Sequence, residues 1–92
     1  MILVYTQAAR DDFADLATYL ESRHPFAIAN VADDILVAID RLTDFPFSGR
    51  RQDEADVRKL VSRRYRYRIF YRVDEEAATV TILAILHPAR QG

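Results

Sequence analysis

The segment from Tyr65 to Val73 alternates between two kinds of side chain. Odd positions are apolar or aromatic and even positions carry arginine or phenylalanine, in the order Tyr65, Arg66, Tyr67, Arg68, Ile69, Phe70, Tyr71, Arg72 and Val73. Because successive side chains of a strand point to opposite faces of a sheet, this pattern predicts one strand whose odd face closes a core. The even face would project three guanidinium groups, whose fixed fork of donors suits carboxylates and phosphates. The strand therefore predicts a surface directed at an anionic partner.

A chain of 92 residues, half of them apolar, has room for one domain, which we expect to span residues 1–92. A domain of this size buries only about 60 to 65% of its unfolded surface, so a partner that covers part of it would add stability. The chain has no cysteine, which excludes a disulfide framework and cysteine-ligated metals.

The beginning of the chain, MILVYTQAARDD, has no basic segment before its apolar run, and that run stops at Thr6. This pattern predicts a strand and not a signal peptide. No stretch approaches the roughly 20 apolar residues that a membrane span needs. We therefore expect a cytoplasmic protein that does not enter a membrane.

Positive charge is concentrated in one part of the chain, although the formal net charge of the whole is -1. Nine basic and three acidic residues lie between positions 50 and 72, so this segment carries +6 and the remainder carries -7. The basic residues are Arg50, Arg51, Arg58, Lys59, Arg63, Arg64, Arg66, Arg68 and Arg72. A surface built from them would attract an acidic partner. The alternative is that they form ion pairs with the chain's own carboxylates.

Two amphipathic helices are expected in the first half of the chain. After a short apolar strand at Ile2–Tyr5, Thr6 is a suitable N-cap, and apolar residues recur at helical spacing until about Arg23. Pro25 suits the first turn of a second helix, whose apolar positions continue to Leu42. The short connection predicts an antiparallel helical hairpin with both apolar stripes turned toward one surface.

Three strands are expected in the second half. A polar loop at Arg50–Asp56 leads to strands at Val57–Ser62, Tyr65–Val73 and Thr79–Leu86. Short turns between consecutive strands predict an antiparallel meander. The element order is then β-α-α-β-β-β, which predicts an α+β fold with the helical hairpin packed on one face of an antiparallel sheet.

His87 is the stronger of the two histidines as a candidate for acid–base chemistry. It follows the last strand directly, where side chains of a sheet can converge, and Arg90 comes soon after it. The alternative is that His87 is an ordinary residue near the end of the chain. His24, beside Pro25, is expected to cap a helix or to be exposed at the helix junction.

Metal-free cleavage of RNA is the reaction that these residues come nearest to supporting. The acidic residues lie mainly at helical spacing on solvated faces and no glycine-rich loop is present, so we expect no metal and no cofactor. RNA cleavage needs a base, an acid and cations that stabilise the phosphorane, and Arg68, Lys59 and His87 are candidates for these roles. A binding surface requires less of the same residues.

Five segments together resemble the RelE/ParE superfamily of toxins from bacterial toxin–antitoxin systems. They are AARDDFADLATYL at 8–20, LTDFPFSGRR at 42–51, VRKLV at 57–61, YRIFYRV at 67–73 and ILAILHPAR at 82–90. The resemblance covers nearly the whole chain. It implies a small toxin that is held inactive in a hetero-oligomer by an antitoxin encoded nearby.

The superfamily contains ribosome-dependent messenger RNA endonucleases, which are RelE-like, and DNA gyrase poisons, which are ParE-like. Arg68 matches the cleavage arginine of the RelE-like branch, and Lys59 matches one of that branch's two alternating basic residues, but the second position is Val61. No tyrosine follows Tyr71, and the ending HPAR resembles the H-x-x-R ending common in ParE-like sequences. The resemblance therefore favours the ParE-like branch and gyrase over the ribosome and its messenger RNA.

On this interpretation the candidate target-binding residues are Arg66, Arg68, Arg72, His87 and Arg90. They would act through charge-assisted bonds to acidic side chains or DNA phosphates. If the chain is instead a nuclease, the catalytic candidates are Arg68, Lys59 and His87. The same face could also be where the antitoxin docks, and a third hypothesis is a protein of this fold that has lost toxicity and only binds its partner.

Overall fold

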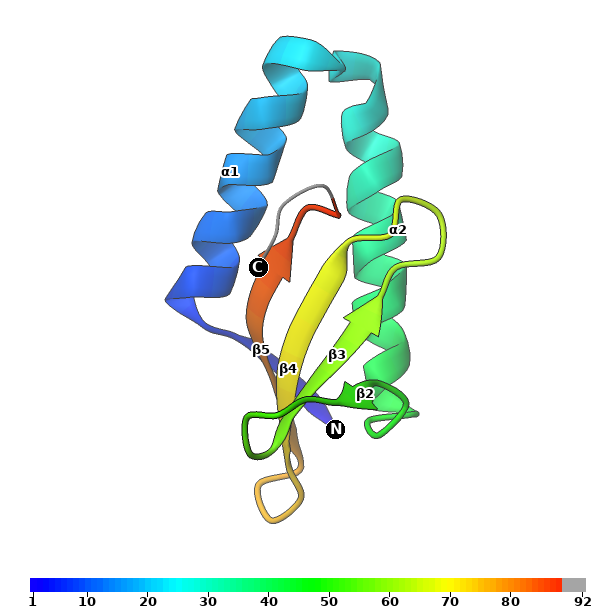
Figure 1. Cartoon of the computed structure of the whole chain (residues 1–92). Helices are drawn as coiled ribbons and strands as arrows, with labels where there is room; N and C mark the ends of the chain where they lie inside the picture. The colour runs from blue at the N-terminus through cyan, green and yellow to red at the C-terminus, as the bar shows by residue number, and fades with distance from the viewer. Residues whose placement is uncertain (89–92) are drawn as a thin grey trace.

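The structure is a computed structural model that describes residues 1–88. It contains two helices and a five-stranded sheet (Figure 1), with short 3-10 turns at Pro25–Ala27 and Arg41–Thr43. The elements are β1 (Ile2–Tyr5), α1 (Gln7–Arg23), α2 (Ile28–Asp40), β2 (Arg50–Arg51), β3 (Val57–Val61), β4 (Arg68–Asp74) and β5 (Thr79–Leu86). The predicted α+β fold with a helical hairpin on one face of the sheet is confirmed.

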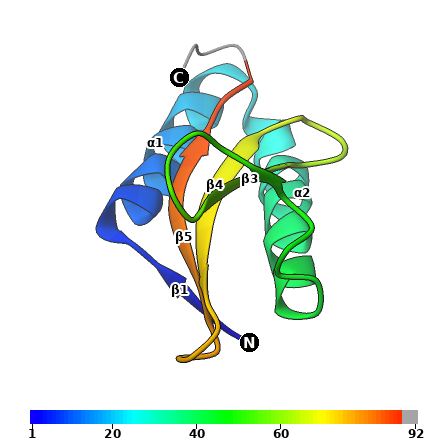
Figure 2. The ribbon, with the colours of Figure 1, turned by 60° about the horizontal axis from the view of Figure 1, so that its bottom comes forward.

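The sheet has the strand order β1-β5-β4-β3-β2 and is mixed, not antiparallel throughout. β1 pairs in parallel with β5 and lies on its outer side (Figure 2), whereas the other pairs are antiparallel. The predicted meander therefore accounts for β3, β4 and β5. The expected polar loop at 50–56 contains β2, a strand of two residues that pairs with β3.

The helix boundaries follow local signals. The Thr6 hydroxyl accepts a hydrogen bond from the Ala9 backbone N–H over 3.1 Å, and α1 ends at Arg23 as predicted. Pro25 begins a 3-10 turn, and the regular part of the second helix starts at Ile28. The second helical segment is therefore shorter than expected, with a 3-10 turn at each end.

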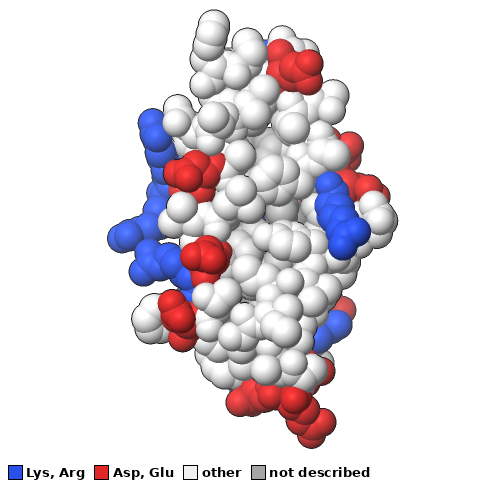
Figure 3. All heavy atoms as spheres, turned by 180° about the vertical axis from the view of Figure 1, so that it is seen from behind, with Lys and Arg blue, Asp and Glu red and all other residues white. Residues whose placement is uncertain are grey.

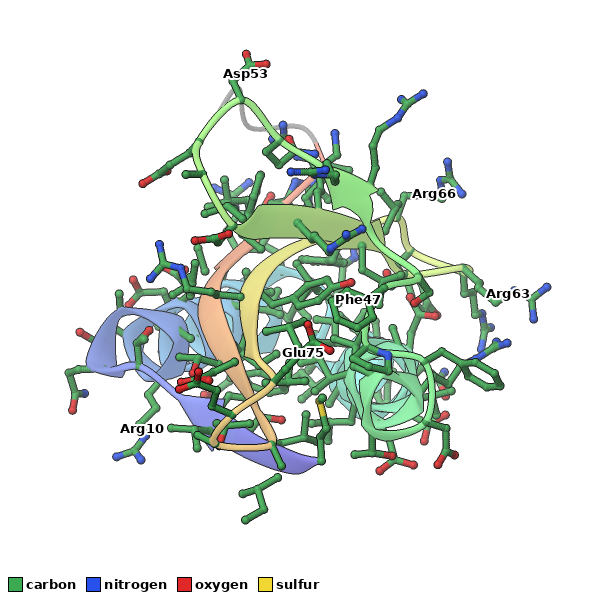
Figure 4. The ribbon with its side chains drawn as sticks, turned by 90° about the horizontal axis from the view of Figure 1, so that it is seen from below. Arg10, Phe47, Asp53, Arg63, Arg66 and Glu75 are labelled. Atoms are coloured by element: carbon green, nitrogen blue, oxygen red, sulfur yellow. The ribbon has the colours of Figure 1, made fainter. Side chains whose placement is uncertain are left out.

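Both helices pack on the same face of the sheet, and the core lies between them and β4 and β5 (Figure 4). α2 contributes more of the core than α1, because it buries four residues and α1 buries two. The fully buried side chains include Ile35, Ile39, Ile69, Tyr71, Val80 and Ile82. Among the strand residues, the odd positions of β4 face the helices, as the alternation predicts.

The alternation does not begin at Tyr65, because β4 starts only at Arg68. The backbone N–H of Ser62 donates to the Tyr67 carbonyl, and the Ser62 hydroxyl accepts from the Tyr67 N–H, each over 2.9 Å, which closes a wide turn. Within this turn Arg66 has a φ of 63°, in the left-handed region that interrupts a strand. The prediction of a strand from Tyr65 to Val73 is therefore wrong at its first three residues.

A β-bulge changes the faces of β5 along its length. Phe70 pairs with Ala84 but Tyr71 pairs with Ile82, so Leu83 is an extra residue. The Thr6 hydroxyl donates to the Leu83 carbonyl over 3.2 Å, and an Asp12 carboxylate oxygen accepts from the Ile85 N–H over 2.9 Å. After the bulge the odd positions of β5 face the helices.

Asp34 on α2 holds the β3–β4 turn in place. One carboxylate oxygen accepts from the Arg64 N–H over 3.0 Å and the other from the Tyr65 N–H over 2.8 Å. Partial burial alone would raise the pKa of Asp34, but the hydrogen bonds from Tyr65, Ser62 and Arg64 outweigh it and the pKa is lowered. These two hydrogen bonds explain how the irregular β3–β4 turn is held against α2.

We expect Asp34→Asn to lower the free energy of unfolding at neutral pH by about 1 to 2 kcal/mol, because an amide has only one acceptor for the two N–H groups. The lowered pKa of Asp34 stabilises the fold above the carboxyl's ordinary pKa, and that contribution is lost as the pH falls through the folded-state pKa. The difference from wild type should therefore shrink in acid. Urea unfolding at several pH values measures it, and Asp33→Asn, at the exposed neighbouring position, is the matched control. Equal stability of the two variants at neutral pH would contradict this role.

Candidate functional site

The face of the sheet away from the helices carries four basic residues around one phenylalanine. Strand register places them, because directly paired residues share a face. Arg50 pairs with Lys59, which pairs with Phe70, and Arg68 and Arg72 flank Phe70 along β4. We call this set, Arg50, Lys59, Arg68, Phe70 and Arg72, the open face. It brings together three of the residues predicted from sequence, Lys59, Arg68 and Arg72.

Arg68 is held at the end of the sheet. Its side chain is partly buried, and its Nη2 donates to the His87 backbone carbonyl over 3.4 Å. Its direct neighbours on the two adjacent strands are Val61 and Leu86. The apolar Val61 thus lies beside Arg68, at the position where RelE-like sequences have the second of their two alternating basic residues.

The His87 ring lies on the opposite side of the sheet from the open face. Its centroid is 5.2 Å from that of buried Tyr67 and 6.0 Å from that of Tyr19 on α1. The bulge at Leu83 causes this placement, because it puts Ile85, and with it His87, on the helix side. The sheet therefore separates the His87 imidazole from Lys59, and the structure does not bring the three nuclease candidates to one face.

Arg66 projects from the β3–β4 turn together with Arg63, away from the body of the fold (Figure 4). It is exposed but is not part of the strand that carries Arg68 and Arg72. Arg90, the remaining predicted contact, lies outside the described residues. The five predicted target-binding residues are thus distributed over the open face, the turn and the helix side, with one beyond the part of the chain that is described.

Two residues of this region have roles that sequence reasoning missed. Arg58 was counted with the surface charge, but its Nη1 donates to the Phe47 carbonyl over 3.2 Å and to the Gly49 carbonyl over 2.9 Å. Its guanidinium carbon also lies 5.1 Å from the centroid of the Phe47 ring. Arg50 was expected in a loop, but β2 aligns it with Lys59. The pairing of β2 identifies the role of Arg50, because two residues are too few for a strand pattern, and the fold of the preceding loop identifies the role of Arg58.

The loop that Arg58 holds is also attached to the core by Tyr71. The Tyr71 hydroxyl accepts from the Gly49 backbone N–H over 2.8 Å. Burial raises the pKa of this hydroxyl above its usual value, although the Gly49 hydrogen bond and the Arg58 charge oppose the shift. Tyr71 is therefore a structural residue that positions the chain entering β2.

Within residues 1–88, no group of three or more histidine, aspartate or glutamate side chains is arranged so that it could hold a metal ion. In the same range, neither helix is long and apolar enough to cross a membrane.

Comparison with known proteins identifies the family. Residues 3–92 match the model of the ParE toxin of the type II toxin–antitoxin system parDE. The protein Y4kP of Sinorhizobium fredii (strain NBRC 101917 / NGR234), named as a candidate toxin, is 34% identical over 77 residues, which are 84% of this chain and 77% of that protein.

Solved structures share the fold. A chain of the chromosomal ParDE system from P. aeruginosa has a TM-score of 0.80 at 22% identity, with 95% of each chain covered. A chain of the intact E. coli RelBE toxin–antitoxin complex has a TM-score of 0.73 at 16% identity, with 97% of this chain and 98% of that chain covered. A chain of the RelBE2 complex from Mycobacterium tuberculosis has a TM-score of 0.61 at 28% identity, with 97% and 92% covered.

The order of the strands, the helical hairpin and the sequence match over residues 3–92 all agree. The chain belongs to the ParE toxin family of type II toxin–antitoxin systems, within the RelE/ParE superfamily.

Proposed function

We propose that this toxin inhibits DNA gyrase, and thereby replication, by binding it through the open face without chemistry of its own. The observation that supports a binding role is the separation of cations from the imidazole. Arg68, Lys59 and Arg72 share one side of the sheet, and the ring of His87 packs between Tyr19 and Tyr67 on the other. Cations alone suffice to hold carboxylates or phosphates, whereas cleavage also requires a proton acceptor within reach of the same atoms.

The open face has the composition of a binding surface for an anionic target. Arginine and lysine supply charge-assisted hydrogen bonds, and Phe70 at the centre supplies apolar area. The phenylalanine is partly buried between its neighbours, so it presents a fixed surface. Acidic side chains of a protein and phosphates of DNA both fit this arrangement, and a gyrase–DNA complex offers both.

The supercoiling reaction of purified gyrase tests the proposal. We expect the free toxin to reduce supercoiling in a concentration-dependent manner and to leave cleaved DNA when the reaction is stopped with detergent. The toxin premixed with its antitoxin is the control and should have no effect. Full supercoiling at a large excess of free toxin would contradict the proposal.

A ribosome-dependent endonuclease is the alternative, and one observation favours it. Arg68 and Lys59, which match basic residues of the RelE-like branch, lie on the same face of adjacent strands. Primer extension on ribosome-bound messages after induction of the toxin distinguishes the two functions. New 5′ ends that depend on Arg68 would support the nuclease and contradict the gyrase proposal.

The partner that neutralises the toxin is, in this proposal, an antitoxin that covers apolar surface on the helix side. Figure 3 shows an uncharged band between charged groups at the two sides of that face. A groove between β1 and α2 is lined mainly by apolar residues, including Leu3, Tyr5 and Leu36. Leu36 is 46% exposed, and Val37, which also lines the groove, is 51% exposed. Exposed apolar patches of this kind mark protein contacts.

Two modes of antitoxin docking fit this face. A helix could fill the groove, or a strand could pair with β1, which is an edge of the sheet.

Growth after induction of the toxin alone, compared with growth after co-induction of the product of the neighbouring gene, tests whether the two form a toxin–antitoxin system. Arrest in the first case and growth in the second support it. Growth in both cases would favour the hypothesis of a fold that has lost toxicity.

A further inference from the structure

A cavity of about 150 Å³ lies on the helix side of the sheet, between α1 and the ends of β4 and β5. It is separate from the open face and has the opposite charge. Its lining consists of two carboxylates, three aromatic or imidazole rings and two aliphatic side chains: Asp12, Asp15, Leu16, Tyr19, Tyr67, Ile85 and His87. No arginine or lysine belongs to the described lining.

The rings form the walls of this cavity. The His87 ring meets Tyr67 edge-on, with an interplanar angle of 85°, and is tilted by 59° against Tyr19. Tyr67 is 4% exposed, so this wall is fixed by the core. The guanidinium carbon of Arg23 lies 4.7 Å from the centroid of Tyr19, so this ring already receives a cation from outside the cavity. Tyrosine faces attract guanidinium and ammonium groups through their quadrupole.

The carboxylates stand on one side of the cavity. Asp12 and Asp15 are three residues apart on α1 and therefore lie on the same helix face. Asp12 uses one oxygen for the Ile85 N–H, which fixes its position. Asp15 is exposed at the surface of the helix and lines the cavity. A flat cation that entered the cavity and lay against one of these rings would meet the carboxylates with its N–H groups.

We propose that this cavity binds a basic side chain of a partner polypeptide, with arginine preferred over lysine. The planar guanidinium can stack on an aromatic ring and donate to a carboxylate at the same time, which a compact ammonium cannot do as well. The site does not depend on whether gyrase or the ribosome is the target. It gives the toxin two recognition surfaces of opposite charge, a basic one on the open face and an acidic one behind the sheet.

Titration of the toxin with N-acetyl-arginine methylamide, followed by two-dimensional amide NMR, tests this site. We expect saturable shifts at Leu16 and Ile85 with a dissociation constant on the order of millimolar, as for a single side chain. The uncharged isostere N-acetyl-citrulline methylamide should bind at least about fivefold more weakly, because it lacks the charge. Equal binding of the two compounds, or shifts confined to other parts of the chain, would overturn the proposal.

Asp15→Asn is expected to weaken binding of the arginine derivative about fivefold, and Tyr19→Leu to weaken it by a similar factor. Both positions are exposed, so the fold should tolerate the changes. Asp11→Asn is the matched control, since Asp11 lies on the same helix and accepts from the Gln7 side chain outside the cavity. Arg90→Gln is measured in parallel. A strong gain of affinity in that variant would assign the cavity to the chain's own arginine and overturn the assignment to a partner.

Discussion

Replacement of Gly49 by alanine is expected to lower the free energy of unfolding by about 3 kcal/mol, although it adds only one carbon atom. A Cβ atom at this position would lie 2.5 Å from the Tyr71 hydroxyl oxygen, 2.7 Å from Cε1 of the same ring and 2.9 Å from the Lys59 carbonyl oxygen. The Tyr71 ring is fully buried and the carbonyl belongs to β3, so relief requires movement of the core or of the sheet. Urea unfolding should show a lower midpoint at an unchanged slope.

The Tyr71→Phe variant separates the contributions to this effect. Alone it should cost about 1 kcal/mol, because the Gly49 N–H loses the acceptor that it contacts over 2.8 Å. In the Tyr71→Phe background, Gly49→Ala should cost about 1 kcal/mol less than in wild type, because the nearest obstructing atom is absent. Gly49→Ala with the stability of wild type would contradict the close approach of the loop to Tyr71.

The double variant Lys59→Gln with Arg68→Gln is expected to raise the toxin concentration for half-inhibition of gyrase by at least about tenfold. Each of these cations can form charge-assisted hydrogen bonds, which contribute about 1.5 to 3 kcal/mol apiece in a desolvated contact, and glutamine keeps only a neutral donor. The supercoiling reaction measures the loss, and growth after induction of the variant measures it for either target. If the double variant were as toxic as wild type, the open face would not be the surface that binds the target.

A control for this result must remove the same charge elsewhere. Arg10 on α1 and Arg63 in the β3–β4 turn are exposed and project away from the fold (Figure 4). The double variant Arg10→Gln with Arg63→Gln should therefore remain within about threefold of wild type, because loss of net charge alone changes mainly long-range steering. Thermal unfolding of both double variants shows whether an activity change reflects binding or folding. A similar loss of activity in the two variants would indicate a nonspecific charge effect.

The alternating pattern of β4 predicted correctly which of its residues face the core and which face away from it. Ile69 and Tyr71 are buried against the helices, and Arg68 and Arg72 lie on the other side, as period-two alternation requires. The first and last strands agree with their apolar runs. The start of α1 agrees with the Thr6 cap, and its end agrees with the proline at position 25. These features depend on neighbours within a few residues, so they could be predicted without the tertiary structure.

The candidate site was less predictable, because its residues come from strands whose pairing is not local. His87 and Arg68 are close in space, but the bulge at Leu83 turns the His87 ring to the helix side. Arg58 and Arg50 each precede another basic residue, yet one is directed to the Phe47–Gly49 loop and the other to the open face. No spacing rule distinguishes them.

The family, the α+β class, most of the elements and the two-sided character of β4 can be predicted from the amino-acid sequence, because each depends on local periodicity or on an ordered set of motifs. The folded chain is needed to see that β1 pairs in parallel with β5, that Arg66 lies outside the strand, and which face the His87 ring occupies. The physical reason is that register, bulges and left-handed turns are set by hydrogen bonds between distant segments, such as those of Asp12 with Ile85 and of Asp34 with Tyr65. Local side-chain patterns do not encode those contacts.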